Sequence, residues 1–442
     1  MARTDVADAP ATTGRDQLLD ALDTRQAHIA VVGLGFAGLP QAVVIAQAGF
    51  TVIGIDTDGE RMAQLDRGES YITDVPSSQV QHLRSEGRFR ATTEPTALAQ
   101  ADCIVICVPT GIGADRRPAL DSLEQALGTV ASALRPPSLV IIESSVPPAT
   151  TRRLARQFRL DGEEQVFVAH APERIDPGNS RFGLRETPRV VGGETSASLD
   201  LAMRFYAQCG IETVPVASIE VAELTKVFEN TFRFVNISLV NELAQIAEGL
   251  NVSAWDVLEA ASTKPYGFMP HAPGPGIGGS CIPVIPFFLA DVAERLGTPS
   301  RLIAAAEQVN RFMPKYVTQR AAALVGRRDG DLAGSHMLVL GVTYKPDQAD
   351  CRHSPALPLV DQLIAAGATV RVHDPLVTEV AGLNTQAGLT PLTPDVVATA
   401  DLVVVVTPHR SLDYQMVVER ARCVLDTRNA LSDLAAPNVV PL

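Results

Sequence analysis

The sequence has 442 residues, 46% of them hydrophobic, and a mean hydropathy of +0.12. Its length is typical of about three domains, and no apolar run is long enough to cross a bilayer, so we expect a globular cytoplasmic protein without a membrane contact. The formal net charge of −13 argues against non-specific nucleic-acid binding, which needs basic patches. Six scattered cysteines show neither a CxxC pair nor Cys/His spacing, which predicts reduced thiols and no metal site.

The first half of the chain has the pattern of an α/β domain. Residues 1–27 are interpreted as a polar N-terminal tail with a short amphipathic piece around Leu18 to Leu22. An apolar strand from His28, a glycine turn, a helix and a second strand then form a βαβ opening. Residues 28–215 are therefore predicted to form one doubly wound domain with a mainly parallel sheet, its later strands at 103–108, 139–142 and 166–169.

A long helix is predicted at 218–250, because this stretch lacks proline and its apolar residues recur at helical spacing. It belongs to a central helical region, 216–325. Residues 326–442 then form a second α/β domain, with strands at 337–340, 369–373, 402–406 and 424–425. Its segments ATVRVHDP and ADLVVVVTP match FTVIGIDTD and ADCIVICVPT of the first domain, which indicates two related Rossmann-like halves. Two unrelated parallel sheets with similar buried strands remain the alternative.

The sequence GLGFAG directly follows the first strand and begins a helix, which is the context of a dinucleotide fingerprint. Gly33 permits the tight turn, Gly35 admits a pyrophosphate, and Gly38 allows the helix to pack on the strand. Asp56 follows at the spacing expected of a carboxylate that binds ribose hydroxyls. It would repel a 2′-phosphate, so NAD is favoured over NADP. FAD and a purely structural glycine turn are the competing interpretations.

Five further positions are candidates for chemistry. Lys226 and Asn230 lie one turn apart on the long helix, although such pairs most often occupy a solvated face. Glu173 and Ser145 follow strand ends, where ligand sites of α/β domains form, and ordinary loop residues are equally compatible. Cys281 ends the glycine-rich segment GPGIGGSC. A lone cysteine is usually a small buried hydrophobe, but a nearby cation such as Lys226 would favour a nucleophilic thiolate.

Together these motifs resemble the UDP-glucose/GDP-mannose dehydrogenase family of nucleotide-sugar 6-dehydrogenases, from about His28 to nearly the end of the chain. The matching segments are VVGLGFAGLP, CVPTG, ESSVPPATT, APERIDPGN, AELTKVFENTFRFVNISLVNELA, TKPYGFMPHAPGPGIGGSC, GVTYKPDQADCRHSPA and VLDTRNAL. The resemblance implies an N-terminal NAD domain, a central region that forms a homodimer through the long helix, and a C-terminal domain for a UDP-sugar.

The resemblance also implies a reaction, the oxidation of a C6 primary alcohol to an acid with two NAD. Cys281 would form a thiohemiacetal and then a thioester, Lys226 would stabilise the oxyanion, and Asn230, Glu173 and Ser145 would position water and protons. The implied NAD contacts are Gly33, Gly35, Phe36, Ala37, Gly38, Asp56, Arg61, Pro109, Thr110, Ser144 and Arg352. The implied substrate contacts are Arg174, Lys226, Asn230, Tyr266, Gly276 and Lys345.

Within the family, KPYGFMPHAPGPG and the PER-x-x-PGN block look most like the branch acting on UDP-N-acetylhexosamines. Ser280 and Ile285 stand where that branch usually has a histidine and an aspartate, and Pro408 interrupts an aspartate-histidine pair before His409. Because that aspartate helps orient the hydrolytic water, an enzyme that stops at the aldehyde or uses another substrate is an alternative. A single-step β-hydroxyacid dehydrogenase and a catalytically degenerate nucleotide-sugar-binding protein are the others.

Overall fold

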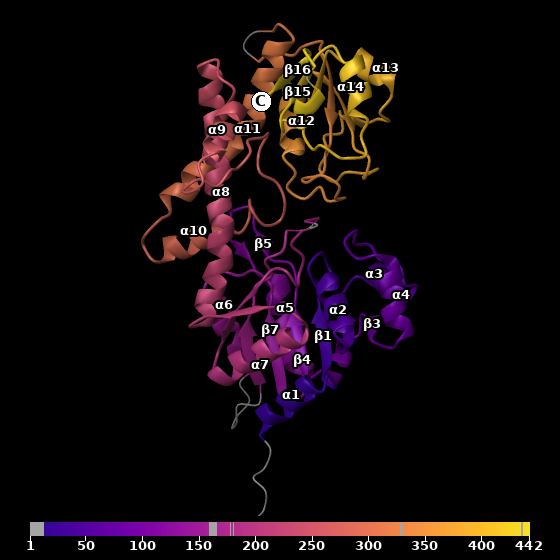
Figure 1. Ribbon diagram of the computed structural model, residues 1–442, viewed down its shortest axis with the longest axis vertical. Coiled ribbons are helices and arrows are strands. Elements are labelled where there is room, and N and C mark those ends of the chain that lie inside the picture. The colour runs from indigo at the N-terminus through magenta and orange to yellow at the C-terminus, as the bar shows by residue number, and fades with distance from the viewer. Residues whose placement is uncertain (1–12, 159–165, 177, 180, 328–329, 435) are drawn as a thin grey trace, which may run out of the picture. The chain divides into compact units, whose positions relative to one another are not determined.

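The computed structural model describes residues 13–158, 166–176, 178–179, 181–327, 330–434 and 436–442. The chain divides into two compact units, Met1–Phe228 and Glu229–Leu442. In Figure 1 the first unit runs from indigo to magenta and the second continues to yellow at the C-terminus.

The first unit is built on one eight-stranded sheet. Its strands are β1 (His28–Val32), β2 (Thr51–Ile55), β3 (Phe89–Thr92), β4 (Cys103–Ile106), β7 (Ser138–Ile142), β8 (Val166–His170), β9 (Arg189–Gly193) and β10 (Thr213–Pro215). Their spatial order is β10-β9-β8-β7-β4-β1-β2-β3, and only the β8–β9 pair is antiparallel. A separate short pair is formed by β5 (Gly111–Ile112) and β6 (Pro118–Ala119). The predicted mainly parallel sheet is confirmed.

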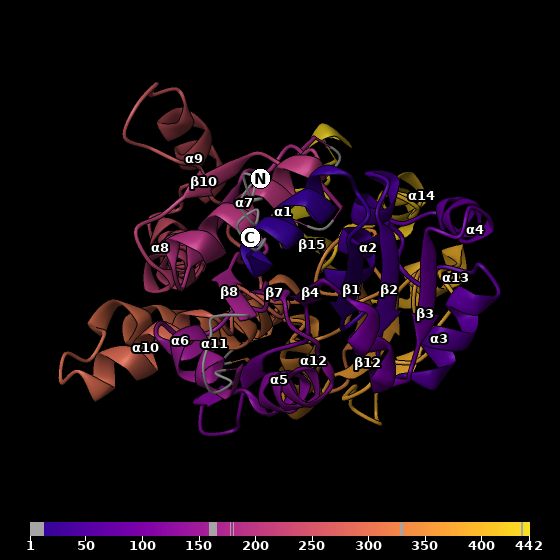
Figure 2. The same cartoon turned by 90° about the horizontal axis from the view of Figure 1, so that it is seen from below.

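Helices cover both faces of this sheet. Figure 2 shows α1 (Gly14–Asp23), α2 (Gly38–Gln47) and α7 (Ser196–Gln208) on one face and α5 (Asp121–Ala133) on the other, each packed on its own apolar core. Because both faces are covered, all five residues of β7 are buried. The remaining helical elements are α3 (Gly59–Asp66), α4 (Ser77–Ser85), α6 (Thr150–Ala155) and the 3₁₀ turns η1 (Pro95–Gln100) and η2 (Arg156–Phe158).

Helix α1 lies in the segment that the sequence assigns to a polar tail. Thr13 caps the helix, since its Oγ1 accepts a hydrogen bond from the Asp16 N–H at 3.2 Å. Leu18 and Leu22 are 3% and 1% exposed and join the apolar core beneath α7. The predicted tail therefore includes a helix that packs on the core of the first unit. Residues 1–12 of the predicted tail lie outside the described residues.

The long helix predicted at 218–250 is α8 (Ile219–Gly249), and it passes through the boundary between the two units. Its sequence is amphipathic in an unusual sense. One face carries exposed apolar side chains, namely Val221, Leu224, Phe228, Phe232, Leu239 and Ile246. The opposite face is buried and carries polar side chains, namely Glu223, Lys226, Asn230, Ser238 and Asn241, among apolar ones such as Val227 and Phe234. A row of exposed large apolar side chains is unusual on the surface of a monomer and indicates an interaction site.

The second unit continues with α9 (Ala254–Ser262), α10 (Pro286–Arg295) and α11 (Arg301–Leu324) and ends in a six-stranded sheet. The strands are β11 (His336–Leu340), β12 (Thr369–His373), β13 (Gly388–Leu389), β14 (Leu402–Val405), β15 (Val424–Asp426) and β16 (Val439–Pro441). They pair only in parallel, in the order β13-β12-β11-β14-β15-β16. Helices α11 and α12 (Ala356–Ala365) pack on one face, and α13 (Pro394–Thr399) and α14 (Tyr414–Arg420) on the other. The 3₁₀ turn η3 (Ser432–Leu434) precedes β16.

The two sheets repeat the same local contacts, which supports the internal echo in the sequence. Gly33 and Gly341 both have positive φ, 88° and 84°, and both donate to the strand alongside at 2.8 Å. The Leu34 N–H donates to Asp56 Oδ2 at 2.7 Å, and the Val342 N–H donates to Asp374 Oδ2 at 2.7 Å. The predicted architecture of two Rossmann-like domains joined by a long helix is therefore present.

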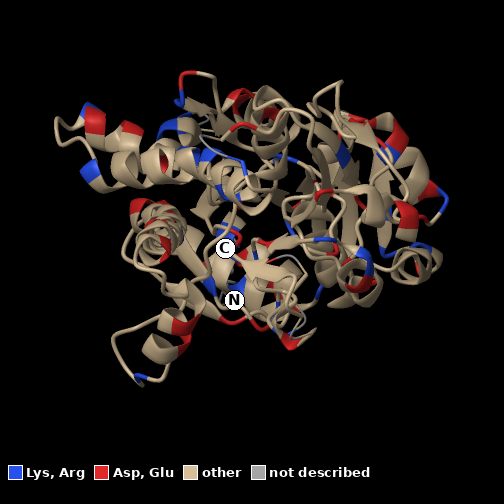
Figure 3. Cartoon of the chain, turned by 90° about the horizontal axis from the view of Figure 1, so that it is seen from above, with Lys and Arg blue, Asp and Glu red and all other residues tan. Residues whose placement is uncertain are grey.

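The surface charges are mixed. Figure 3 shows Asp and Glu interleaved with Lys and Arg along the ribbon, so the formal charge of −13 is distributed over many elements. Within the described ranges, the helices lack any segment both long enough and apolar enough to span a membrane.

Candidate active site

The glycine fingerprint forms the turn between β1 and α2. Gly33 adopts a left-handed φ of 88°, and a Cβ on Gly38 would lie 1.8 Å from the Gly33 carbonyl oxygen. A Cβ on Gly35 would have no neighbour within 4 Å, so this position leaves open space beside the turn. The tight turn, the open approach and the close helix packing are the three features that a dinucleotide pyrophosphate requires. The residues present therefore fit NAD.

Asp56 lies at the end of β2 and is half-buried. Its Oδ2 accepts from the Leu34 N–H at 2.7 Å, and its Oδ1 accepts from the Asp58 N–H at 3.0 Å. A carboxylate has about four acceptor positions, so it can hold this turn and still accept from ribose hydroxyls. This contact between Asp56 and the glycine turn was not predicted from the sequence. Arg61 is nearby, with its Nε 3.1 Å from Asp58 Oδ2 and its guanidinium 5.4 Å from the Tyr71 ring centre.

Four of the predicted cofactor and catalytic residues meet at the carboxyl ends of β4 and β7. These strands are paired in register up to Ile106 and Ile142. Beyond them, Thr110 Oγ1 donates to the Ser145 carbonyl at 2.6 Å, and Ser144 Oγ donates to the Val108 carbonyl at 2.7 Å. Pro109 is part of the same edge. Phe36, in the glycine turn, is 37% exposed and Ala37 begins α2 beside it.

Glu173 and Arg174 follow β8. The Glu173 N–H donates to the Glu143 carbonyl at 3.3 Å, and its carboxylate accepts from the Ile175 N–H. Arg174 Nη1 donates to the Pro188 carbonyl at 2.7 Å. Glu173 is thus held beside the end of β7, as expected from its place in the chain.

A buried ion pair underlies this edge and was not predicted. Glu143 and Arg189 are 2% and 3% exposed, and Arg189 Nη1 lies 3.6 Å from Glu143 Oε2. The Tyr206 hydroxyl donates to Glu143 Oε1 at 2.6 Å, and Arg189 Nη2 donates to Gln41 Oε1 at 3.1 Å. Burial opposes the charge of Arg189, but the Glu143 carboxylate raises its pKa, so the guanidinium stays cationic. The pair ties α2 and α7 to the sheet below the site.

Glu223 connects the long helix to the loop after β7. It is 1% exposed, and its two carboxylate oxygens accept from the N–H groups of Ala149 and Thr151 at 2.6 and 2.7 Å. Ala149 has a left-handed φ of 72°, which this contact helps to hold. Burial raises the pKa of Glu223 to about 7, although the backbone N–H donors act in the opposite direction.

Lys226 and Asn230 occupy the same buried face of α8, one turn beyond Glu223. They are 8% and 5% exposed. The interpretation of this pair as a solvated surface face is therefore wrong, and a buried ammonium is a group with a structural or chemical function.

Cys281 is exposed and ends a loop that two asparagines hold. The Gly274 N–H donates to Asn241 Oδ1 of α8 at 2.9 Å, and the Ile277 N–H donates to Asn310 Oδ1 of α11 at 2.7 Å. Gly276 has a φ of 136°, which favours glycine. Neither asparagine was predicted. The signal available was Asn241, a polar residue on the inner face of a long helix.

The loop before Cys281 packs on the segment that follows β11. A Cβ on Gly278 or Gly279 would lie 2.9 or 2.8 Å from the Tyr344 side chain, so these glycines allow close contact. Arg352 Nη2 donates to Asp350 Oδ2 at 2.7 Å, and this contact, with a smaller contribution from Cys281, raises the pKa of Arg352. The structure thus brings the nucleophile candidate near the segment that carries Lys345 and Arg352.

Two positions near Cys281, Ser280 and Ile285, depart from the family pattern. Ile285 is 3% exposed at the start of α10, and its N–H donates to the Cys281 carbonyl at 2.8 Å. Ser280 Oγ lies 3.8 Å from Cys281 Sγ. Tyr266 is 73% exposed, with the Lys264 ammonium 5.1 Å from its ring centre.

Known proteins match the chain over nearly its whole length. The NAD-binding, central and UDP-binding domains of the UDP-glucose/GDP-mannose dehydrogenase family match residues 27–210, 220–312 and 338–433. A UDP-N-acetyl-D-mannosamine dehydrogenase of Methanocaldococcus jannaschii is 31% identical over 92% of this chain and 93% of its own. An NDP-N-acetyl-D-galactosaminuronic acid dehydrogenase of Ralstonia nicotianae is 32% identical over 93% and 98%.

A solved structure agrees. The UDP-D-ManNAc dehydrogenase of Pyrococcus horikoshii superimposes with a TM-score of 0.81 at 31% identity, covering 91% of this chain and 95% of that one. The matched domains include the NAD-binding domain, and relatives that match over most of their length are named dehydrogenases. The chain is thus an NAD-dependent nucleotide-sugar dehydrogenase and belongs to the UDP-glucose/GDP-mannose dehydrogenase family.

Proposed function

We propose that this protein oxidises the C6 alcohol of a UDP-N-acetylhexosamine to the uronic acid through a covalent intermediate on Cys281. The observation that carries the proposal is the exposed Cys281 thiol at the end of a loop held by Asn241 and Asn310. The relatives named UDP-N-acetyl-D-mannosamine dehydrogenase make that sugar nucleotide the first to test.

The cofactor would lie across the glycine turn and the ends of β4 and β7. Its pyrophosphate would approach at Gly35, where a Cβ has no neighbour within 4 Å, and the α2 N-terminus would favour its charge. Asp56 would accept from the ribose hydroxyls, with Arg61 beside it. When bound, NAD accepts a hydride. Phe36, Ala37, Pro109, Thr110, Ser144 and Arg352 are the other proposed contacts.

The proposed role of Cys281 follows from its exposure at the end of a loop that Asn241 and Asn310 hold. Its thiolate would add to the C6 aldehyde carbon, forming a C–S bond and a hemithioacetal oxyanion that takes up a proton. Loss of a hydride from that carbon to bound NAD, together with loss of the hydroxyl proton to a base, would leave a thioester, and attack by water would then break the C–S bond to release acid and thiol. Two hydrides leave the substrate for each acid formed.

Lys226 would stabilise the negative oxygen of these intermediates, since a buried ammonium is a stronger partner than a solvated one. Asn230, Glu173 and Ser145 would orient water and transfer protons. Arg174, Tyr266, Gly276 and Lys345 would contact the sugar nucleotide. The exposed side chain of Tyr266 would then be ordered by ligand rather than by its own domain.

The experiment is a panel of UDP-N-acetylmannosamine, UDP-N-acetylglucosamine and UDP-glucose, with NADH and product mass both measured. Two NADH per acid are expected for the accepted sugar, and Cys281→Ser should lower acid formation by about 10³-fold or more. One NADH per aldehyde would instead show that the reaction stops after the first oxidation. Buried Ile285 favours that second candidate, because it brings no polar group to the water. Activity that survives Cys281→Ser unchanged would contradict the covalent route.

We also propose a homodimer. The exposed apolar face of α8 extends over most of its 31 residues, and a second copy would present the same face by symmetry. Six large apolar side chains in one stripe are enough for an interface core of ordinary size.

A further inference from the structure

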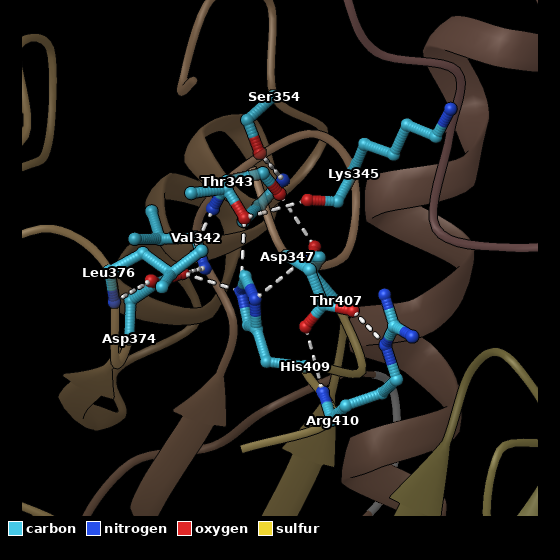
Figure 4. A network of polar contacts seen from close by, with 11 residues as sticks. Val342, Thr343, Lys345, Asp347, Ser354, Asp374, Leu376, Thr407, His409 and Arg410 are labelled. Atoms are coloured by element: carbon cyan, nitrogen blue, oxygen red, sulfur yellow. Dashed lines mark hydrogen bonds and ion pairs between the residues drawn. The ribbon is translucent and has the colours of Figure 1, made fainter. Parts of the chain in front are cut away.

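A buried polar cluster fixes the loop that follows β11, and the proposed chemistry does not use it. His409 is 0% exposed and lies among Thr343, Asp347 and Asp374 (Figure 4). The Asp347 N–H donates to His409 Nδ1 at 3.0 Å, which requires an unprotonated Nδ1 and places the ring hydrogen on Nε2. Nε2 lies 3.1 Å from Asp374 Oδ2 and 3.0 Å from Thr343 Oγ1. One imidazole thus joins three separate segments.

Asp374 is an ionised anchor for this cluster. Its oxygens accept from the N–H groups of Val342, Thr343 and Leu376 at 2.7, 3.1 and 2.9 Å. Burial opposes its charge, but these donors and His409 lower the pKa of Asp374 to about 2. His409 therefore has a carboxylate partner from β12 even though Pro408 occupies the preceding position.

The cluster holds a strained residue. Asp347 has a φ of 60°, a left-handed conformation that residues with a Cβ rarely adopt. Its backbone is held by His409, and its carboxylate accepts from the Arg410 N–H at 3.0 Å and from Arg410 Nε. A non-glycine residue stays in this region only where its surroundings determine it.

The internal repeat places His409 at the position of Thr110, a proposed NAD contact of the first half. Aligning ADCIVICVPT with ADLVVVVTPH places Pro408 on Pro109 and His409 on Thr110. Asp374 corresponds to Asp56, with the same 2.7 Å contact to its glycine turn. In the first half this crevice is proposed to receive NAD. In the second half the buried His409 ring stands at this position and lies 3.1 Å from the equivalent carboxylate of Asp374.

We propose that His409, together with Asp374 and Arg410, positions the 343–350 loop for the sugar nucleotide. The inference rests on the proposed function, because Lys345 in this loop is the assigned substrate contact. Thr343 Oγ1 donates to the Lys345 carbonyl at 3.1 Å, and Figure 4 shows the Lys345 side chain extending away from His409. Tyr344 packs on Gly278 and Gly279, so the same loop also supports the segment before Cys281.

Two substitutions separate the two sides of the imidazole. In His409→Asn the Oδ1 takes the place of Nδ1 and can accept from the Asp347 N–H. In His409→Gln the amide reaches toward Asp374 and leaves that N–H without its acceptor. His409→Gln should raise KM for the UDP-sugar about tenfold, the loss expected for one buried hydrogen bond, with kcat and KM for NAD nearly unchanged. His409→Asn should raise KM for the UDP-sugar by less than His409→Gln does.

The measurements are steady-state kinetics, calorimetric titration with UDP alone, and thermal unfolding. The control is Arg422→Gln, which removes an exposed ion pair to Asp401 at the other end of β14 and should change none of them. Adding Asp347→Gly to His409→Gln should recover part of the UDP affinity, because glycine adopts the left-handed turn at little cost.

The positioning role would be overturned if His409→Asn and His409→Gln changed KM for the UDP-sugar equally. It would also be overturned if the variants changed only the melting temperature and left KM and UDP affinity unchanged. If the wild-type protein binds UDP but oxidises no UDP-sugar, the proposed function fails, and the order of UDP affinities among the variants still decides this inference. A wild-type protein that does not bind UDP contradicts both.

Discussion

Three glycines of this chain differ in what a new methyl group would meet. A Cβ on Gly38 would overlap the Gly33 carbonyl at 1.8 Å, whereas one on Gly35 or Gly128 would have no neighbour within 4 Å. Gly38→Ala should therefore destabilise the first unit by about 1–3 kcal/mol, the range for overpacking. Gly35→Ala should leave the melting temperature unchanged and raise the NAD dissociation constant at least about tenfold, since its methyl group would stand where the pyrophosphate approaches.

Thermal unfolding and titration with NADH check both effects. The control is Gly128→Ala within α5. Alanine in a helix should raise the free energy of unfolding by about 0.5–1 kcal/mol and leave the NAD dissociation constant unchanged. Tight NAD binding by folded Gly35→Ala would contradict the placement of the pyrophosphate.

The residue scale also shows where a local pattern misleads. Lys226 and Asn230 have the spacing of a solvated helix face, yet both are buried. Asp56 was assigned to the ribose and also holds Leu34. In both cases the side chain's neighbours come from distant parts of the sequence, which residue spacing does not contain.

At the scale of elements, α8 and the loop before α6 are joined by Glu223. Because burial raises the pKa of Glu223 from 4.5 to about 7, the folded protein retains a proton between these pH values that the unfolded chain has released. The free energy of unfolding therefore falls as pH rises from about 4.5 to 7, by an amount on the order of 3 kcal/mol for this group. Glu223→Gln cannot ionise and should lack this component.

The control is Glu220→Gln, one turn earlier on the same helix. A hydrogen bond from Arg152 lowers the pKa of Glu220 to about 2, so its contribution is present above 4.5 and is lost as pH falls toward 2. Melting temperatures from pH 3 to 8 distinguish the two groups. If Glu223→Gln follows the wild-type curve between pH 4.5 and 7, the assignment to Glu223 is wrong.

At the scale of the whole molecule, the apolar face of α8 is exposed along the part of the chain that the structure describes. Leu239, 60% exposed, lies in the middle of the apolar face of α8. Leu239→Arg would place two charges face to face in the proposed symmetric interface, and the particle mass should fall from about twice 47.0 kDa to one chain. Light scattering after gel filtration measures this. Leu296→Arg, at a 74% exposed leucine after α10, should leave the mass unchanged. A monomeric wild-type protein would contradict the proposal.

The two α/β halves, the glycine turn and the long helix could be predicted from the sequence alone. These depend on local periodicity and backbone torsion, so the strand at 369–373 was predicted to the residue and the strand at 337–340 to within one residue. Short edge strands such as β13 and β16 were missed, since two or three residues give no period. The amphipathic piece before His28 was visible, but its burial under α7 was not.

Only the tertiary structure decided which polar groups act together. Asn241 and Asn310 hold the loop before Cys281 from two helices, and Asp374 supplies the partner that Pro408 seemed to remove from His409. The members of each set are separated by more than 30 residues. Their contacts arise where parallel strands end at one edge and where helices cross a loop, and chain topology rather than neighbouring residues sets those places.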